Sequence, residues 1–208
     1  MNERIGIFGG SFNPVHTGHI RAAQSFLDSG FIQKLWVLPA AEPPHKPGEK
    51  LEPFHHRAEM LRIAFQNLTE VDVVELEKNL PKPSYTLQTF QNLKQHFPDR
   101  TFYLCIGSDT LASFTTWHRY RELLDLTELL VAERPGSVQR EVPNEILEQV
   151  HFVKHDPVAI SSTDIRKTDL NEKTEEDIHK KGSEPDRTTL TKEVAEYIRK
   201  NNLYRVER

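Results

Sequence analysis

Two histidines three residues apart are the first side chains in this chain that could do chemistry. His16 and His19 enclose Thr17-Gly18 in the run IFGGSFNPVHTGHI, and Gly9-Gly10 precede them. Glycines let a ligand approach the backbone without a Cβ in the way. A helix beginning near Thr17 would direct free N–H groups and its positive dipole end toward the same point. With an imidazole on either side of the helix start, this pattern predicts a site for an anion such as a nucleotide triphosphate.

A metal site is the alternative use of such a histidine pair. Zinc needs three or four protein ligands at characteristic spacings, and no third ligand is spaced near His16 and His19. The positive end of a helix dipole also disfavours a cation. We therefore expect no metal site here, although the pair alone could equally be structural.

Two further segments carry groups that could bind phosphate. Lys46 follows a proline-rich stretch, which could hold its ammonium over the site. The run ISSTDIR offers the hydroxyls of Ser161, Ser162 and Thr163 before a predicted helix, and Arg166 lies about one turn later. Simpler roles stay open: a solvated lysine in the first case and a helix cap in the second.

Three residues near the middle of the chain could contact a nucleotide or a ring. Asp109 follows Gly107 at the end of an apolar run and could accept a hydrogen bond from a ribose hydroxyl, or simply cap a turn. Trp117 lies among polar residues in FTTWHRY, where it could stack on a heteroaromatic ring, although tryptophan is more often a core residue. Cys105 is expected to be a packed small hydrophobe.

Alternating apolar runs and amphipathic stretches must position these groups. The apolar runs predict strands at Ile5 to Phe8, Leu35 to Leu38, Val71 to Val74, Thr101 to Ile106, Glu128 to Ala132 and Val150 to Val153. Helical patterns lie between them. This alternation predicts an α/β fold, Rossmann-like and doubly wound, with a mostly parallel sheet and a small C-terminal helical part.

Capping and breaking residues mark the predicted helices. Gly30 is expected to stop the first helix, a second runs from Phe54 to Leu68, and Ser84 is expected to cap a third. The strongly charged segment 168–189 is predicted to be an exposed, mobile excursion that adds no catalytic group. Residues 190–204 are predicted to form a last helix.

Composition narrows the classes of protein. The chain has 208 residues, a size that suits one domain over 1–208, and a net charge of −4, which does not favour nucleic acid as a partner. Its single cysteine allows no internal disulfide and fits a reducing compartment. No run is long and apolar enough for a signal peptide or a membrane span, so we expect a cytoplasmic protein that does not bind membranes.

Several blocks of the sequence resemble one known family. GGSFNPVHTGHI resembles the phosphate-binding signature of the HxGH nucleotidyltransferases. LPAAEPPHKP, HHRAEMLRIA, SYTLQT, YLCIGSDTLASFTTWHRYRELL, VAERPG and ISSTDIR resemble, in order, blocks of the bacterial nicotinate-nucleotide adenylyltransferases. The resemblance covers Ile5 to Arg166 and resumes weakly at LTKEVAEYIRKNNLY. It implies adenylyl transfer from ATP to nicotinate mononucleotide, giving deamido-NAD and pyrophosphate in NAD biosynthesis.

The resemblance also implies roles for individual residues. The catalytic residues implied are His16, His19, Lys46 and Arg166. The residues implied for ATP are Gly9, Gly10, Ser11, Phe12, His16, Gly18, His19, Gly107, Asp109, Ser161, Ser162, Thr163 and Arg166. Those implied for nicotinate mononucleotide are Lys46, Tyr85, Thr86, Trp117 and Arg134. Mg2+ would arrive with ATP, without a dedicated protein site.

One position departs from the family pattern, and some alternatives stay open. Gln88 stands where the family block has an acidic residue, so its role is in doubt. Donors at Tyr85 and Thr86, with no acidic residue in SYTLQTF, predict a preference for nicotinate over nicotinamide mononucleotide of at least about tenfold. The open alternatives are adenylyl transfer to nicotinamide mononucleotide or phosphopantetheine, and a non-catalytic nucleotide sensor. Whether the protein is a homo-oligomer is also open.

Overall fold

The computed structural model describes residues 2–44, 48, 50–133, 142–158, 160–167 and 189–205. Among these residues, six parallel strands form one sheet in the order β3-β2-β1-β4-β5-β6. The strands are β1 (Arg4–Gly10), β2 (Lys34–Pro39), β3 (Val71–Val73), β4 (Thr101–Gly107), β5 (Glu128–Glu133) and β6 (Val150–Lys154). All six strands predicted from the apolar runs are confirmed, with ends shifted by two residues at most.

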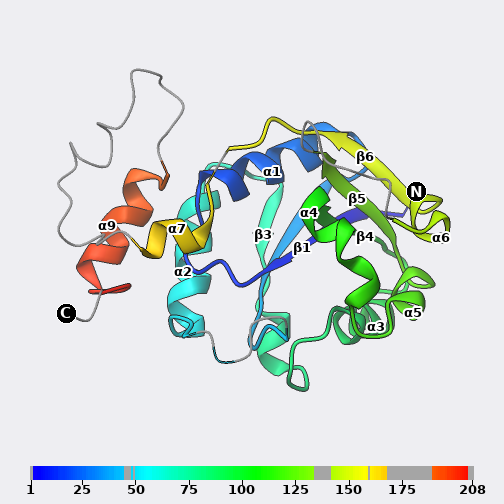
Figure 1. Ribbon diagram of the computed structural model, residues 1–208, viewed down its shortest axis with the longest axis horizontal. Helices are drawn as coiled ribbons and strands as arrows, with labels where there is room; N and C mark the ends of the chain where they lie inside the picture. Colours follow the sequence, from blue (N-terminus) through cyan, green and yellow to red (C-terminus); the bar gives the residue numbers. More distant parts are fainter. Residues whose placement is uncertain are drawn as a thin grey trace.

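Helices cover both faces of the sheet, as Figure 1 shows. Those described are α1 (Thr17–Asp28), α2 (Phe54–Phe65), η1 (Leu76–Asn79), α3 (Thr86–His96), α4 (Ser108–Ala112), η2 (Phe114–Thr116), α5 (Tyr120–Leu124), α6 (Asn144–Leu147), α7 (Ser162–Arg166) and α9 (Lys192–Lys200). Side chains of α1, α2 and α9 enter one buried apolar cluster, and those of α3, α4, α5 and α6 enter another. The predicted Rossmann-like α/β fold is confirmed.

The strands are almost wholly apolar because both of their faces are covered. Along β2, Leu35 and Val37 belong to one cluster, whereas Trp36 and Leu38 belong to the other. This alternation follows from the two-residue period of a strand. The sheet is therefore a rigid platform between two apolar layers.

The order of the strands fixes where a ligand can bind. From β1 the chain moves outward through β2 to β3, and then returns to place β4 on the other side of β1. Between β1 and β4 the direction of winding reverses, which leaves a crevice beyond the carboxyl ends of these two strands. Gly9 and Gly10 end β1 and Gly107 ends β4, so the glycines identified in the sequence meet at this crevice.

Of the capping predictions, one is confirmed and one is wrong. Gly30 follows α1 with φ +73°, the left-handed conformation that glycine adopts without strain at a helix end. Helix α3 begins at Thr86 with Tyr85 as its N-cap, so Ser84 does not cap it. The Ser84 hydroxyl instead accepts a hydrogen bond of 3.0 Å from the backbone N–H of Glu42, because the loop after β2 passes beside it.

The predicted C-terminal helix over 190–204 is shorter in the structure. Helix α9 packs against α2 and ends at Lys200 (Figure 1), after which Leu203 and Tyr204 turn back into the core. The predicted excursion over 168–189 lies outside the described residues, except for Thr189. No helix within the described ranges is long and apolar enough to cross a membrane.

Candidate active site

The loop between β1 and α1 is built around a buried phenylalanine. Phe12 has φ +44° and is almost fully buried, with its ring edge-on to Phe8 at 5.6 Å and to His19 at 5.0 Å between centroids. A Cβ on Gly10 would lie 3.1 Å from the Phe12 ring, so a larger residue there would require the ring to shift by a few tenths of an ångström. Phe12 therefore supports the loop and His19 from beneath.

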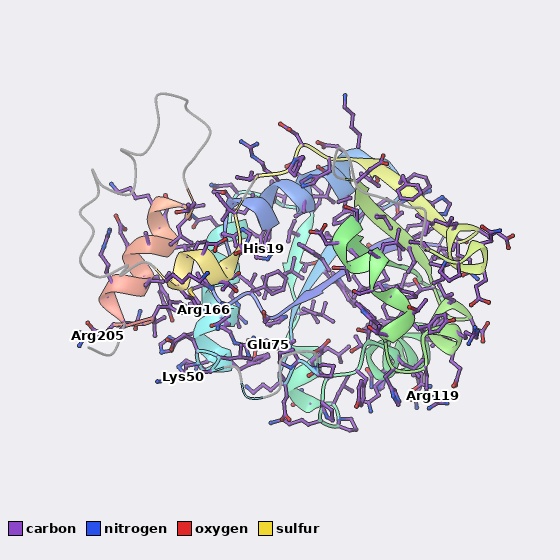
Figure 2. All side chains as sticks on the ribbon, in the orientation of Figure 1. His19, Lys50, Glu75, Arg119, Arg166 and Arg205 are labelled. Carbon is purple, nitrogen blue, oxygen red and sulfur yellow. The ribbon has the colours of Figure 1, made fainter. Side chains whose placement is uncertain are left out.

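Three side chains from outside this loop bind its carbonyl oxygens. Nη1 of Arg57 donates to Ser11 at 2.8 Å, Nη1 of Arg166 donates to Asn13 at 2.6 Å, and the Ser162 hydroxyl donates to Pro14 at 2.9 Å. These donors come from α2 and α7, which are far apart in the sequence (Figure 2). The loop is thus held in one position by the two helices that flank it.

Asn13 connects the same loop to the C-terminal part of the chain. Its fully buried Oδ1 accepts from the backbone N–H of Glu52 at 3.1 Å and from the Tyr204 hydroxyl at 3.0 Å. Its Nδ2 donates to the carbonyl of Lys50 at 3.4 Å. Buried polar groups that are satisfied in this way specify a single conformation.

The two histidines lie against each other rather than on either side of the helix start, so that part of the prediction is wrong. His16 is the N-cap of α1, and its ring centroid is 3.8 Å from that of His19. The pair adopts this arrangement because the backbone N–H of His16 donates to Nδ1 of His19 at 3.2 Å. A Cβ on Gly18 would lie 3.0 Å from the His16 ring, so a side chain there would require the ring to shift by a few tenths of an ångström.

These contacts define the protonation state of His19. Since Nδ1 accepts a hydrogen bond, the proton of the neutral ring is on Nε2. Desolvation by the surrounding protein, and then the neighbouring His16, lower the pKa of His19 well below its usual value. At neutral pH His19 is therefore an uncharged N–H donor and not a cation.

N–H groups at the start of α1 already have partners, and that of His19 donates to the carbonyl of His16 at 2.9 Å. The backbone N–H of Thr17 donates to the carbonyl of Thr189 at 3.2 Å. The expectation that this helix start directs free N–H groups at the crevice is therefore wrong for the N–H of Thr17. The carbonyl of Thr189, which lies shortly before α9, comes to the helix start from the C-terminal part of the chain.

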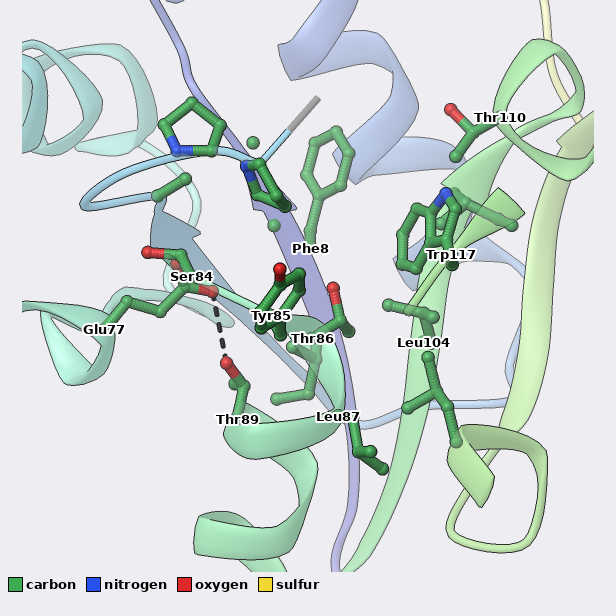
Figure 3. A pocket seen from close by; sticks show the side chains of 18 of the residues that line it. Phe8, Glu77, Ser84, Tyr85, Thr86, Leu87, Thr89, Leu104, Thr110 and Trp117 are labelled. Atoms are coloured by element: carbon green, nitrogen blue, oxygen red, sulfur yellow. Dashed lines mark hydrogen bonds between the residues drawn. The ribbon is translucent and has the colours of Figure 1, made fainter. Parts of the chain in front are cut away.

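A cavity of about 330 Å³ opens beside this loop at the crevice between β1 and β4 (Figure 3). Seven of the residues predicted for the two substrates line it: Gly9, Gly10, Ser11, Tyr85, Thr86, Gly107 and Trp117. Figure 3 shows Trp117 on one side and Tyr85 and Thr86 near the middle. The structure thus brings the glycines of two strands and the predicted ring-binding side chains to one cavity.

Four other predicted residues either lie away from the cavity or fall outside the described residues. Asp109 is exposed in the first turn of α4, and it does not line the cavity. Ser161 caps α7 by accepting from the backbone N–H of Asp164 at 3.1 Å, so the capping role is confirmed for this hydroxyl. Lys46 and Arg134 lie outside the described residues.

Sequence reasoning missed an acidic residue in the cavity. Glu77 lines it from η1, only 7% exposed, and its Oε1 accepts from the Thr89 hydroxyl at 3.2 Å. Burial raises the pKa of Glu77 to about 7, although hydrogen bonding from Ser84, Thr89 and the backbone of Ala41 acts in the opposite direction. The sequence does not indicate the burial of Glu77, because the polar run ELEK is typical of an exposed turn.

Glu77 corrects one premise of the sequence analysis. The expected preference for nicotinate assumed that no acidic residue borders the ring-binding side chains, and only SYTLQTF was considered for this. Glu77 comes from a different segment and reaches the same cavity. Gln88, by contrast, does not line the cavity, and its buried Oε1 has no hydrogen-bond partner among the described residues.

The residues that the structure describes contain no cluster of three or more His, Cys, Asp or Glu side chains that could hold a metal ion. Burial raises the pKa of the Cys105 thiol, which packs in the core at 1% exposure as the sequence indicated. The groups that line the cavity therefore include the backbone at the glycines, hydroxyls and aromatic rings, and His16 and His19 are not among its lining residues. The lining groups can position phosphates and a heteroaromatic ring without forming a covalent bond to either.

A doubly wound sheet with a glycine-ended first strand and a histidine pair at the following helix start defines a nucleotide-binding protein of the nucleotidyltransferase class. The family model described as Cytidylyltransferase-like matches residues 7–168. The chain is 32% identical over 204 residues to the nicotinate-nucleotide adenylyltransferase of Bacillus subtilis (strain 168), over 97% of this chain and 98% of the relative. The chain therefore belongs to the cytidylyltransferase-like family and, within it, to the nicotinate-nucleotide adenylyltransferases.

Solved structures with the same fold include two of the Plasmodium falciparum nicotinic acid mononucleotide adenylyltransferase. The one complexed with NaAD superimposes with a TM-score of 0.77 at 23% identity, over 98% of both chains. The one complexed with APC gives a TM-score of 0.75 at 22% identity, again over 98% of both chains. At these identities the two structures support the fold alone.

Proposed function

We propose that this chain transfers the adenylyl group of ATP to nicotinate mononucleotide, giving deamido-NAD and pyrophosphate in NAD biosynthesis. The observation that carries the proposal is the single cavity that joins Gly9 and Gly10, beside the histidine pair, to Tyr85 and Trp117. A triphosphate and a pyridine ring would meet there. Membership of the nicotinate-nucleotide adenylyltransferases agrees with this assignment.

The reaction needs no nucleophile from the protein. The phosphate of the mononucleotide is already an anion at neutral pH, and one of its oxygens attacks the α-phosphorus of ATP in line. A new P–O bond forms while the bond from the α-phosphorus to the bridging oxygen breaks, and pyrophosphate leaves with that electron pair. No covalent enzyme intermediate forms, so catalysis consists of positioning and charge stabilisation.

His19 supplies a donor suited to this step. Its neutral ring keeps the proton on Nε2 because Nδ1 is occupied by the backbone N–H of His16. A neutral donor stabilises the charge that develops on the α-phosphate without paying for desolvation of a cation in the free enzyme. His16, at 3.8 Å between ring centroids, would contact the same phosphate.

Arg166 and Lys46 are proposed to neutralise the charge of the incoming and leaving phosphates. One arm of the Arg166 guanidinium binds the carbonyl of Asn13, and the other lies 3.4 Å from the Thr163 hydroxyl. With five N–H donors, a guanidinium can hold the loop and contact a phosphate together. Lys46 is proposed from the family resemblance alone.

We also propose that Mg2+ would arrive with ATP without a dedicated protein site, that the enzyme works in the cytoplasm, and that residues 1–208 form one catalytic domain. When bound, the ion would polarise the triphosphate and favour release of pyrophosphate. The protein's own contribution would remain the positioning of the two substrates.

Mass spectrometry of the products tests the proposal. The purified chain is incubated with ATP, Mg2+ and, separately, nicotinate mononucleotide, nicotinamide mononucleotide or phosphopantetheine. We expect deamido-NAD and pyrophosphate as the main products. Product only from phosphopantetheine would assign another transferase activity, and no product from any acceptor, despite ATP binding, would indicate a nucleotide sensor.

A further inference from the structure

The Glu77 carboxyl lies close to the residues proposed to bind the pyridine ring. It accepts from Thr89, which lies one turn of α3 after Tyr85 and Thr86, the positions where that helix begins. Glu77, Tyr85, Thr86 and Trp117 all line the same cavity. In Figure 3, Glu77 and Trp117 lie on opposite sides, with Tyr85 and Thr86 between them, so a ring held against Trp117 would extend toward Glu77.

The neighbours of Glu77 leave its charge only weakly compensated. Oε1 accepts from Thr89, whereas the buried Oε2 makes no hydrogen bond of normal geometry with any described residue. The charged group that acts on it from a packed element is Arg57 of α2, whose guanidinium is committed to the carbonyls of Glu52 and Ser11. Burial outweighs all of these contacts and raises the pKa of Glu77 to about 7.

Among the described residues, no other titratable side chain near Glu77 is a buried carboxylic acid that lines the cavity. On its own element, Lys78 pairs with Glu75, which also pairs with Arg62 outside the cavity. The other titratable side chains that line the cavity are Tyr85, Cys105 and His118. Burial raises the pKa of the Cys105 thiol, and His118 is exposed and stacks on the Tyr85 ring at 4.2 Å between centroids. Glu77 is therefore the buried acid of this cavity.

We propose that Glu77 makes the choice between nicotinate and nicotinamide mononucleotide depend on pH, through its own state of ionisation. The neutral carboxylic acid can donate its O–H to the nicotinate carboxylate, whereas the ionised form repels that group and accepts from the NH₂ of an amide. The inference rests on the proposed function, because it concerns the second substrate of that reaction. It predicts strong selection for the acid at low pH and weaker selection at high pH.

The sign and the size of the effect follow from linkage. Below pH 7 the Glu77 carboxyl is mostly protonated and favours binding of nicotinate mononucleotide. Above pH 7 it is mostly ionised, so binding of nicotinate mononucleotide either places two carboxylates together or requires Glu77 to take up a proton. The ratio of the two catalytic efficiencies can then fall by at most about tenfold per pH unit. Both mononucleotides carry the same phosphate and pyridinium ring, so other titrations largely cancel in this ratio. We expect a total fall of at least about tenfold between pH 6 and pH 9.

Kinetics with matched variants provide the first test. The ratio of kcat/KM for nicotinate mononucleotide to that for nicotinamide mononucleotide is measured from pH 6 to pH 9. In Glu77→Gln, whose amide oxygen can still accept from Thr89, the ratio should be constant within about twofold. Glu75→Gln is the control: this glutamate is two residues away, and Arg62 lowers its pKa, so its removal should leave the wild-type fall intact.

Calorimetry of the wild-type protein provides a test that needs no variant. Binding of each mononucleotide is measured at pH 8 in two buffers that differ in ionisation enthalpy. Nicotinate mononucleotide should take up close to one more proton than nicotinamide mononucleotide. This difference should disappear in Glu77→Gln if that variant folds, and the wild-type result decides the question if it does not.

The outcomes separate the two proposals. A ratio independent of pH in the wild type, an unchanged fall in Glu77→Gln, or equal proton uptake by the two ligands would each overturn the role of Glu77 while the adenylyl transfer stands. No product from either mononucleotide at any pH would overturn the proposed function instead. Binding with the expected difference in proton uptake but without turnover would keep Glu77 as the selecting residue and contradict only the transferase assignment.

Discussion

Replacing His19 with alanine removes a donor whose proton is placed on Nε2 by the hydrogen bond to Nδ1. The backbone N–H of His16 occupies Nδ1, so Nε2–H is the group available to a phosphate. Loss of one preorganised donor to developing charge costs about 3 kcal/mol, which is more than a hundredfold in kcat. We therefore expect kcat to fall by about two orders of magnitude.

The same substitution has a smaller cost for folding. His16 N–H loses its acceptor at 3.2 Å, and Phe12 loses an edge contact at 5.0 Å. Each of these contributes about 1 kcal/mol, so the protein should unfold at a lower temperature but remain folded at 25 °C. The loss of turnover should then exceed anything that the loss of stability can explain.

The assay follows pyrophosphate release with saturating ATP, Mg2+ and nicotinate mononucleotide, beside thermal unfolding of the same samples. His96→Ala is the matched control, because His96 is an exposed histidine near the end of α3 that contacts only the Asn92 carbonyl among the bonds described. It should leave kcat unchanged. Turnover within a few-fold of wild type in folded His19→Ala would refute the assigned role of Nε2–H.

Three further predictions follow from the structure. Gly18→Ala places a methyl group 3.0 Å from the His16 ring, so we expect kcat/KM to fall by about tenfold or more with little change in unfolding temperature, and an unchanged kcat/KM would contradict the packing argument. Burial raises the pKa of Glu77 to about 7, so the wild type loses stability as pH rises from the unfolded value to 7 and no further above it; above pH 7, urea unfolding should find Glu77→Gln more stable by about 3 kcal/mol, with no such gain at pH 4. Limited proteolysis should cut first within 168–189, and a first cut in α1 or α3 would refute the predicted excursion.

Much of the fold follows from local pattern. The strands are nearly continuous apolar runs such as LCI in β4, and the helices carry a 3.6-residue repeat, so their existence and order could be predicted. Gly30 could be assigned to a helix end because few residues other than glycine adopt its positive φ without strain. Ser84 could not be placed correctly, because its partner, the backbone N–H of Glu42, is 42 positions away in the sequence.

Some site residues could likewise be predicted from the local sequence, whereas others depend on contacts between distant segments. The glycines before His16 and the ring of Trp117 stand out by residue type and context, so they could be proposed as site residues, whereas Tyr85 is proposed from the family resemblance. The contact between the two histidine rings depends on a hydrogen bond within one turn, from the backbone N–H of His16 to Nδ1 of His19, which residue type alone does not show. The burial of Glu77 arises only when separate segments pack together. The sequence could not show that the Asn13 side chain is fully buried and makes three hydrogen bonds, because its partners come from positions 50–52 and 204.

The ties between the first loop and the C-terminal part of the chain have a consequence for the order of assembly during synthesis. Thr189 and Tyr204 supply contacts to Thr17 and Asn13, the latter across 191 positions. The N-terminal strand and helix leave the ribosome long before these partners exist. A chain that ends before Thr189 therefore lacks the last supports of the turn between β1 and α1. The geometry of this turn would then be completed only after the C-terminal residues have been synthesised.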